Sequence, residues 1–194
     1  MPHINNNKKF AFVHIPKCAG NSVKKVLNLT GQNHGTIRQN YIPSYFNFTF
    51  VRNPWDRFIS SYEYIKAGGW GANFPDQDWD RHFCNSLNNF NSIHEFARNS
   101  AVWRGWLHFT TQFEYVSIND KTDCLDFIGR VENLQEDLKY ICEEIGCKYS
   151  IAPHNNKTKT KQKHYTSYYD DELKEIVGSV YAKDIEYFGY KFGE

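Results

Sequence analysis

The chain has 194 residues, of which 40% are hydrophobic and 23% are charged, and its formal net charge is +1. This composition supplies a packed core and excludes a disordered chain, while the near-zero charge argues against a protein that coats nucleic acid. The length predicts a single domain over residues 1–194.

The cysteines and the apolar pattern bear on where the protein works. The five cysteines include no C-x-x-C pair, so neither a disulfide framework nor a zinc site is expected. The opening residues, MPHINNNKK, lack the apolar core of a signal peptide, and no apolar run reaches the roughly 18 residues of a membrane span. We therefore expect a cytoplasmic protein without a membrane span.

Residues 10–29 have the pattern of a strand, a tight loop and a helix. Phe10 to Ile15 is a short apolar run that predicts a buried strand, and Pro16 and Gly20 interrupt it. A helix is predicted from Ser22, with apolar positions at Val23, Val26 and Leu27 and with Lys24 and Lys25 on the opposite face.

This arrangement favours the binding of a phosphate-like anion. A loop that opens a helix points backbone N–H groups at one spot, where the helix adds about half a positive charge. Lys17 lies in the loop before Gly20, whereas the common nucleotide loop has its lysine after the last glycine. The alternative is an ordinary strand-to-helix turn with a surface lysine.

A second strand and helix follow in the segment NFTFVRNPWDRFISSYEY, residues 47–64. Phe48–Val51 predicts a buried strand, Asn53 is a candidate N-cap, and Pro54 suits the first helical position. The apolar face of the helix comprises Trp55, Phe58, Ile59, Tyr62 and Ile65. Arg52 and Ser60 are candidates for a second anion site, because a guanidinium group binds phosphate bidentately.

At these two segments the chain resembles a known family. HIPKCAGNS and VRNPWDRFISSY are similar to the signature segments of sulfotransferases that use 3′-phosphoadenosine-5′-phosphosulfate (PAPS), especially the carbohydrate branch. FIGRVENLQEDL, PHNNKTK and the segment from Tyr168 to Tyr190 resemble the family in the same order. The Golgi members are membrane-anchored, whereas this chain resembles a soluble catalytic domain alone.

The resemblance implies residue roles and the donor. The first segment cradles the 5′-phosphosulfate of PAPS, and the second binds its 3′-phosphate. By position, the first role falls to Lys17, Cys18, Ala19, Gly20, Asn21 and Ser22, and the second to Arg52 and Ser60. The chain departs from the family at Cys18 and Asn21, where threonine is usual, and at Ala19, where glycine is usual.

Sulfuryl transfer to a hydroxyl needs charge stabilisation on the leaving phosphate and a general base. Lys17 is the candidate for the first task. His34, in the connection between the two anion segments, is the candidate base, with His108 and Glu63 in reserve, whereas His14 is expected to be a scaffold residue. No metal is expected.

The lysines of residues 157–163 allow two interpretations. They form either a solvated loop or a flap over PAPS, and the resemblance favours the flap, with Lys163 among the cofactor-binding residues.

The remaining segments complete an α/β pattern. A strand is predicted at 125–131, a helix over Leu134–Ile145 capped by Asn133, a capping box at Ser92–Glu95, and a last helix after Asp170 that ends at Gly189. The region 30–45 is expected to be loop-rich. The glycine-rich and aromatic region 67–91 is expected to be irregular, either lining a sugar-binding groove or anchored on the core. The fold class is a parallel β-sheet flanked by helices, with ligands bound beyond the carboxyl ends of the strands.

The leading hypothesis is a PAPS-dependent sulfotransferase that acts on a carbohydrate hydroxyl. The alternatives are a nucleotide-binding protein without turnover, a kinase-like phosphoryl transferase, and an RNA-binding protein. The missing Lys-Ser/Thr pair after the glycine and the lack of an evident Mg²⁺ carboxylate argue against the kinase. The near-neutral charge argues against RNA binding.

Overall fold

The computed structural model describes residues 3–31, 34–72, 78–152 and 163–194. Most of the predicted lysine flap, residues 157–162, lies outside the described residues. The chain divides into a first compact unit, Met1–Arg52 with Gln112–Gln162, and a second, Asn53–Thr111 with Lys163–Glu194. This division describes local packing, and the single domain over 1–194 stays a prediction.

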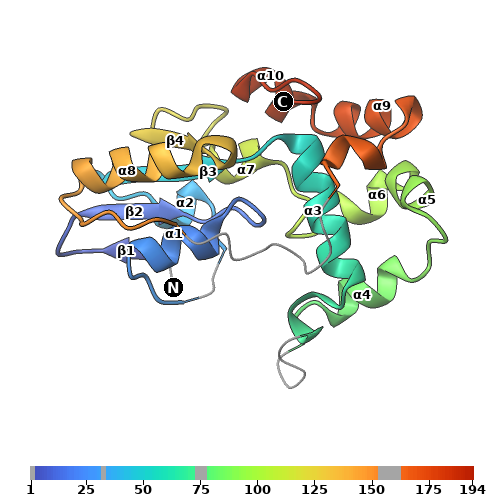
Figure 1. Cartoon of the computed structure of the whole chain (residues 1–194), viewed down its shortest axis with the longest axis horizontal. Helices are drawn as coiled ribbons and strands as arrows, with labels where there is room; N and C mark the ends of the chain where they lie inside the picture. Colours follow the sequence, from blue (N-terminus) through green and yellow to red (C-terminus); the bar gives the residue numbers. More distant parts are fainter. Residues whose placement is uncertain (1–2, 32–33, 73–77, 153–162) are drawn as a thin grey trace. The chain divides into compact units, whose positions relative to one another are not determined.

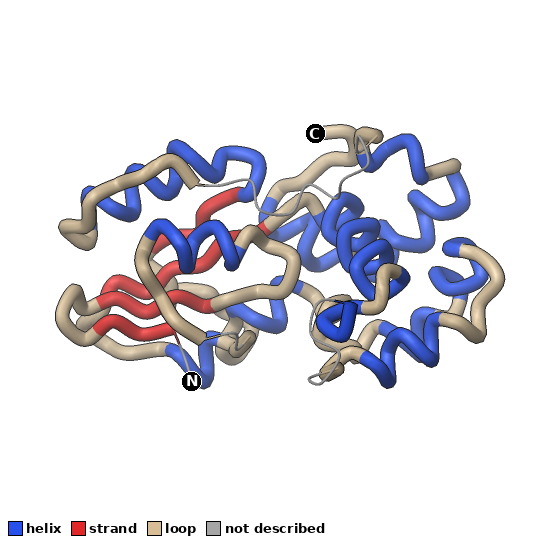
Figure 2. The backbone as a smooth tube through the Cα atoms, turned by 60° about the horizontal axis from the view of Figure 1, so that its bottom comes forward, coloured by secondary structure: helices blue, strands red, loops and turns tan. Residues whose placement is uncertain are grey.

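The first unit is built on a four-stranded sheet, coloured red in Figure 2. Its order is β1 (His3–Asn5), β2 (Phe10–Val13), β3 (Phe46–Val51) and β4 (Phe127–Arg130). β2, β3 and β4 run parallel, and β1 pairs antiparallel with β2. The α/β fold with a mostly parallel sheet is therefore confirmed.

The register of the sheet brings two strand ends together. Val13 is level with Thr49, and Val51 is level with Arg130, so the chain leaves β2 and β3 at the same edge. The Thr49 hydroxyl reinforces the pairing by donating to the Val13 carbonyl at 2.8 Å. Buried phenylalanines fill the strands, with Phe12 stacked on Phe48 at a centroid distance of 5.2 Å.

Short helices accompany this sheet: α1 (Gly20–Val26), α2 (Ile37–Asn40), α7 (Gln112–Val116), η3 (Val131–Asn133) and α8 (Leu134–Glu144). α8 packs against β4 and α2 against β2 (Figure 1). The predicted inner face of α8 is confirmed, because Leu134, Leu138, Ile141, Cys142 and Ile145 are all buried.

Two local predictions for this unit need correction. The connection 30–45, predicted to be loop-rich, also contains the short helix α2, which a Thr36 and Gln39 capping box stabilises. Lys24 does not lie on a solvent face: it is buried, and its Nζ donates to the Gly31 carbonyl at 3.0 Å. Asn133 occupies the N-cap position of α8 but makes no capping bond with its side chain.

In the described residues, the second unit is helical. It contains α3 (Pro54–Lys66), η1 (Gly69–Ala72), α4 (Arg81–Leu87), α5 (Ile93–Arg98), α6 (Ser100–Trp103), η4 (Tyr165–Tyr168), α9 (Asp171–Val180) and α10 (Ala182–Phe188). α3 packs against α4, η4 and α9. As predicted, Asn53 caps α3 by accepting from the Trp55 N–H at 3.2 Å, Pro54 begins the helix, and its apolar face is buried.

Two predictions for this unit are wrong in part. The region 67–91, expected to be irregular, contains η1 and α4. The expected single helix after Asp170 is broken at Tyr181, which has φ −103° and ψ 21°. Tyr181 is buried there, and its hydroxyl donates to the Phe109 carbonyl at 2.8 Å, a tertiary bond that local periodicity does not encode.

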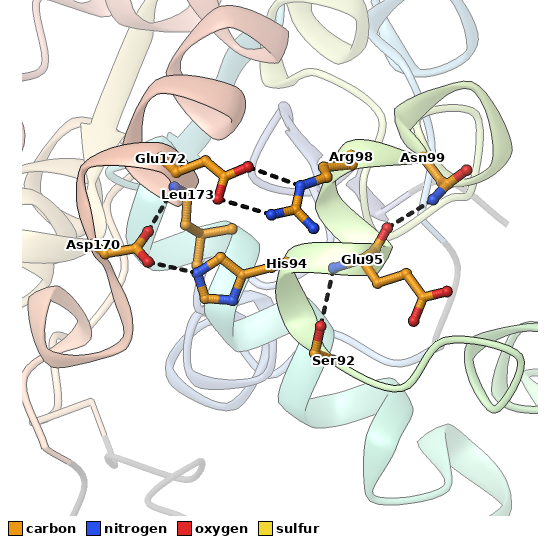
Figure 3. Close-up of polar contacts among 8 residues, drawn as sticks. All are labelled: Ser92, His94, Glu95, Arg98, Asn99, Asp170, Glu172 and Leu173. Carbon is orange, nitrogen blue, oxygen red and sulfur yellow. Dashed lines mark hydrogen bonds and ion pairs between the residues drawn. The ribbon is translucent and has the colours of Figure 1, made fainter.

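α5 and α9 are joined by a polar seam at the surface (Figure 3). His94 Nε2 lies 2.9 Å from Asp170 Oδ2. Arg98 forms a bidentate ion pair with Glu172, in which Nε donates to Oε1 and Nη2 donates to Oε2, each at 2.8 Å. Asp170 also caps α9, as predicted, by accepting from the Leu173 N–H at 2.8 Å. The pKa of Asp170 is lowered by this backbone bond and then by His94, and the pKa of Glu172 is lowered by Arg98.

These shifts predict a loss of stability in acid. A carboxyl group whose folded-state pKa lies below its unfolded value adds stability above the unfolded value, and that stability is lost as the pH falls through the folded value. The loss should therefore begin below the ordinary pKa values of 3.8 for Asp170 and 4.5 for Glu172. Urea unfolding at neutral pH and at about pH 3 gives the decrease in the free energy of unfolding on acidification. This decrease should be smaller for the double variant Asp170→Asn/Glu172→Gln than for wild type. The control is Glu175→Gln on the same helix, and an equal drop in all three proteins would contradict the prediction.

Candidate functional site

The loop between β2 and α1 has an unusual backbone. Lys17 has φ 66° and Ala19 has φ 56°, so two residues with a Cβ adopt the left-handed conformation on either side of Cys18. Such residues cost about 1–3 kcal/mol each and persist only where their surroundings hold them. The Ala19 carbonyl accepts from Ser22 N at 2.9 Å and Val23 N at 3.1 Å, so α1 begins its internal hydrogen bonding directly after this loop.

Gly20 is required because of a side chain that packs over it. A Cβ on Gly20 would lie 1.8 Å from Nε2 of His14. His14 is buried and stacks on Phe12 at a centroid distance of 5.6 Å. This position fits the expected scaffold role of His14.

His34, the candidate base, lies against the same residue. Its ring centroid is 4.2 Å from that of His14, and its Nδ1 is 3.3 Å from the His14 carbonyl oxygen. Since a carbonyl oxygen only accepts, this contact requires the proton on Nδ1. A neutral His34 then carries its basic lone pair on Nε2, which is the tautomer that a general base at Nε2 needs.

Arg52 leaves the adjacent strand at the same edge. Its Nη1 donates to the Lys17 carbonyl at 3.2 Å. The structure therefore brings together, at these two residues, the two segments that were predicted to bind anions. Lys17 and Arg52 are both partly exposed. Ser60 lies on α3 in the second unit, and Lys163 lies exposed before η4, also in the second unit. The functional roles of all four residues stay predictions.

Gln112 is a residue that the sequence analysis missed. It is fully buried, and its side chain bonds to both backbone groups of Arg52: Oε1 accepts from Arg52 N at 2.8 Å, and Nε2 donates to Arg52 O at 2.8 Å. The Cys18 thiol donates to the same Oε1 at 3.2 Å. The partners are 60 and 94 residues away, so no local spacing signals them.

The reserve base His108 lies in a buried network of the second unit. Asp80 accepts from the Tyr64 hydroxyl and from Trp70 N, each at 2.8 Å, and its other oxygen is 3.9 Å from His108 Nδ1. Burial and then Asp80 raise the pKa of Tyr64. Because Asp80 and His108 are both about 5% exposed, the network anchors η1 to α3 and leaves little surface for an acceptor. Glu63 is half-buried on α3.

Two further properties of the described residues are relevant. No three His, Cys, Asp or Glu side chains among them are grouped to hold a metal ion. In the same part of the chain, no helix combines the length and the apolar character that crossing a membrane requires.

The packing of His14 on Gly20 predicts that even one added methyl group is damaging. Gly20→Ala forces the ring or the loop to move, and overpacking of this kind typically costs about 1–3 kcal/mol. Urea unfolding of Gly20→Ala should show a decrease of this size in the free energy of unfolding. The control is Gly105→Ala, where an added Cβ meets no atom within 4 Å, and equal stability of the two variants would contradict the packing.

Comparisons with known proteins agree with this arrangement. A model described as "Sulfotransferase family" matches residues 3–191. An uncharacterized protein of Archaeoglobus fulgidus is 30% identical over 105 residues, which are 53% of this chain and 68% of that protein. The search of solved structures found no match.

Proposed function

The chain belongs to the sulfotransferase family, and from that premise we propose that it transfers a sulfuryl group from PAPS to an acceptor hydroxyl, most favourably that of a carbohydrate. The observation that carries the proposal is the bond between Arg52 and the Lys17 carbonyl. It joins the loop after β2 to the end of β3, where a nucleotide with phosphate groups at two ends needs two cationic contacts.

The loop and its lysine would hold the phosphosulfate end. The Lys17 ammonium group and the N–H groups of Gly20 and Asn21 supply positive charge and donors for phosphate oxygens, and Cys18, Ala19 and Ser22 complete the segment. The guanidinium of Arg52 would bind the 3′-phosphate. For Ser60 and Lys163, the proposed role in nucleotide binding rests on the sequence motifs alone.

The proposed chemistry is an in-line transfer. His34 Nε2 accepts the proton of the acceptor hydroxyl as its oxygen forms a bond to sulfur. The bond between sulfur and the bridging oxygen breaks, and the charge that develops on the departing phosphate is stabilised by Lys17. The residues fit this donor because they offer cations and N–H groups without a carboxylate among residues 14–22.

The first test needs no knowledge of the acceptor. The product nucleotide, 3′-phosphoadenosine-5′-phosphate, should bind to the wild-type protein in calorimetry, and Arg52→Ala should weaken binding more than tenfold, or about 1.4 kcal/mol. Arg38→Ala, an exposed arginine of the same unit, is the matched control and should bind like wild type. No binding, or equal binding by both variants, would overturn the proposed site.

The second test addresses turnover. His34→Gln should lower the rate of product-nucleotide formation from PAPS with a panel of carbohydrate acceptors by about 10²–10⁴-fold, because it removes the base. Nucleotide binding should be unchanged. His82→Gln, at an exposed histidine, should keep full activity. Binding by wild type without turnover on any acceptor would instead favour a nucleotide-binding protein.

A further inference from the structure

One buried carboxamide connects the two proposed anion-binding elements. Gln112 Oε1 accepts from Arg52 N at 2.8 Å and from the Cys18 thiol at 3.2 Å, and Nε2 donates to Arg52 O at 2.8 Å. The orientation of the amide is fixed, because turning it over would set Nε2 against the Arg52 N–H and Oε1 against the Arg52 carbonyl. The shared oxygen therefore links the loop to the strand end through a single atom.

Arg52 needs such a partner because the sheet ends before it. The last paired residue of β3 is Val51, which is level with Arg130 of β4. Gln112 bonds to both the N–H and the C=O of Arg52, as the backbone of another strand would. These two bonds hold the backbone of Arg52 at the point where the chain leaves the sheet.

Cys18 needs a partner for a different reason. It lies between Lys17 and Ala19, whose left-handed backbone is strained, and its own side chain is 1% exposed. A buried thiol bonded to Gln112 fixes the middle of this loop, and so supports the strained residues on each side.

From these contacts we infer that Gln112 is a positioning residue that sets the Arg52 guanidinium and the Lys17 loop for the two ends of one nucleotide. The inference rests on the proposed function, and it adds a residue that touches no ligand. It separates two effects: loss of Gln112 disturbs both ends of the nucleotide, whereas loss of the Cys18 thiol disturbs the loop end alone.

The experiment compares two nucleotides by calorimetry. 3′-Phosphoadenosine-5′-phosphate carries the 3′-phosphate, and adenosine 5′-phosphate lacks it. The dissociation constant of adenosine 5′-phosphate divided by that of 3′-phosphoadenosine-5′-phosphate measures how much the contact of Arg52 with the 3′-phosphate adds to binding. Partial unfolding weakens the apparent binding of both nucleotides equally and does not change this ratio. Gln112→Met should reduce the ratio about tenfold, which corresponds to the loss of about one charge-assisted hydrogen bond. It should also weaken the binding of both nucleotides.

The chain offers a matched control for this substitution. Gln135 likewise bonds to both backbone groups of one residue and to one side chain: it accepts from Ala152 N at 3.0 Å and from the Tyr149 hydroxyl at 2.7 Å, and it donates to Ala152 O at 3.0 Å. Gln135→Met removes the same chemistry in the same unit and should leave the ratio unchanged. Gln112→Glu, which keeps the acceptor but sets an oxygen against the Arg52 carbonyl, should lower the ratio even if the methionine variant does not fold.

The thiol variants test the link to the loop. Cys18→Ala should weaken the binding of both nucleotides by a similar factor and leave the ratio unchanged, and Cys18→Ser, which keeps a donor, should recover part of that loss. If wild type does not prefer the 3′-phosphorylated nucleotide, the proposed function and this inference both fall. If wild type prefers it and the Gln112 variants keep the same ratio, the proposed function stands and the positioning role is overturned.

Discussion

The parallel pairing of β2 with β3 is the constraint on which the candidate site depends. It makes two segments that are about 35 residues apart leave the sheet at one edge, so that the Arg52 guanidinium reaches the Lys17 carbonyl. The pairing is held by backbone bonds, by the Thr49 hydroxyl and by stacked phenylalanines within the strands. Two cationic residues therefore meet without any excess of positive charge over the whole chain, whose net charge is only +1.

The loop after β2 is held by contacts on both of its sides. The His14 ring fills the space that a side chain on Gly20 would occupy, and the Cys18 thiol reaches the buried Gln112. These contacts compensate for the left-handed backbone at Lys17 and Ala19. A preformed loop of this kind has less conformational freedom to lose when an anion binds, which favours affinity.

Much of the fold follows from local patterns, and the failures have a common cause. The strands at Phe10 and Phe48, the cap at Asn53 and the inner face of α8 depend on neighbours within a few residues, so the sequence predicts them. The burial of Lys24, the break at Tyr181 and the role of Gln112 depend on carbonyl, hydroxyl or amide partners elsewhere in the fold. Hydrophobic periodicity carries no information on such bonds. For the candidate site, the motifs assigned Lys17 and Arg52 to the two ends of one nucleotide, whereas Gln112, which bonds to Arg52 and Cys18, belongs to no motif.

The departures from the family at positions 18 and 19 have different physical effects. Cys18 replaces the usual threonine with another donor, and the thiol uses that capacity on Gln112. Ala19 replaces the usual glycine where φ is 56°, a conformation that costs a residue with a Cβ about 1–3 kcal/mol. Alanine restricts the unfolded chain more than glycine does, by about 0.4–1 kcal/mol, which offsets part of this strain. The bonds from Ser22 and Val23 to the Ala19 carbonyl then retain the turn. With cysteine at position 18 and alanine at position 19, the loop is thus held by the Gln112 contact on one side and by the first bonds of α1 on the other.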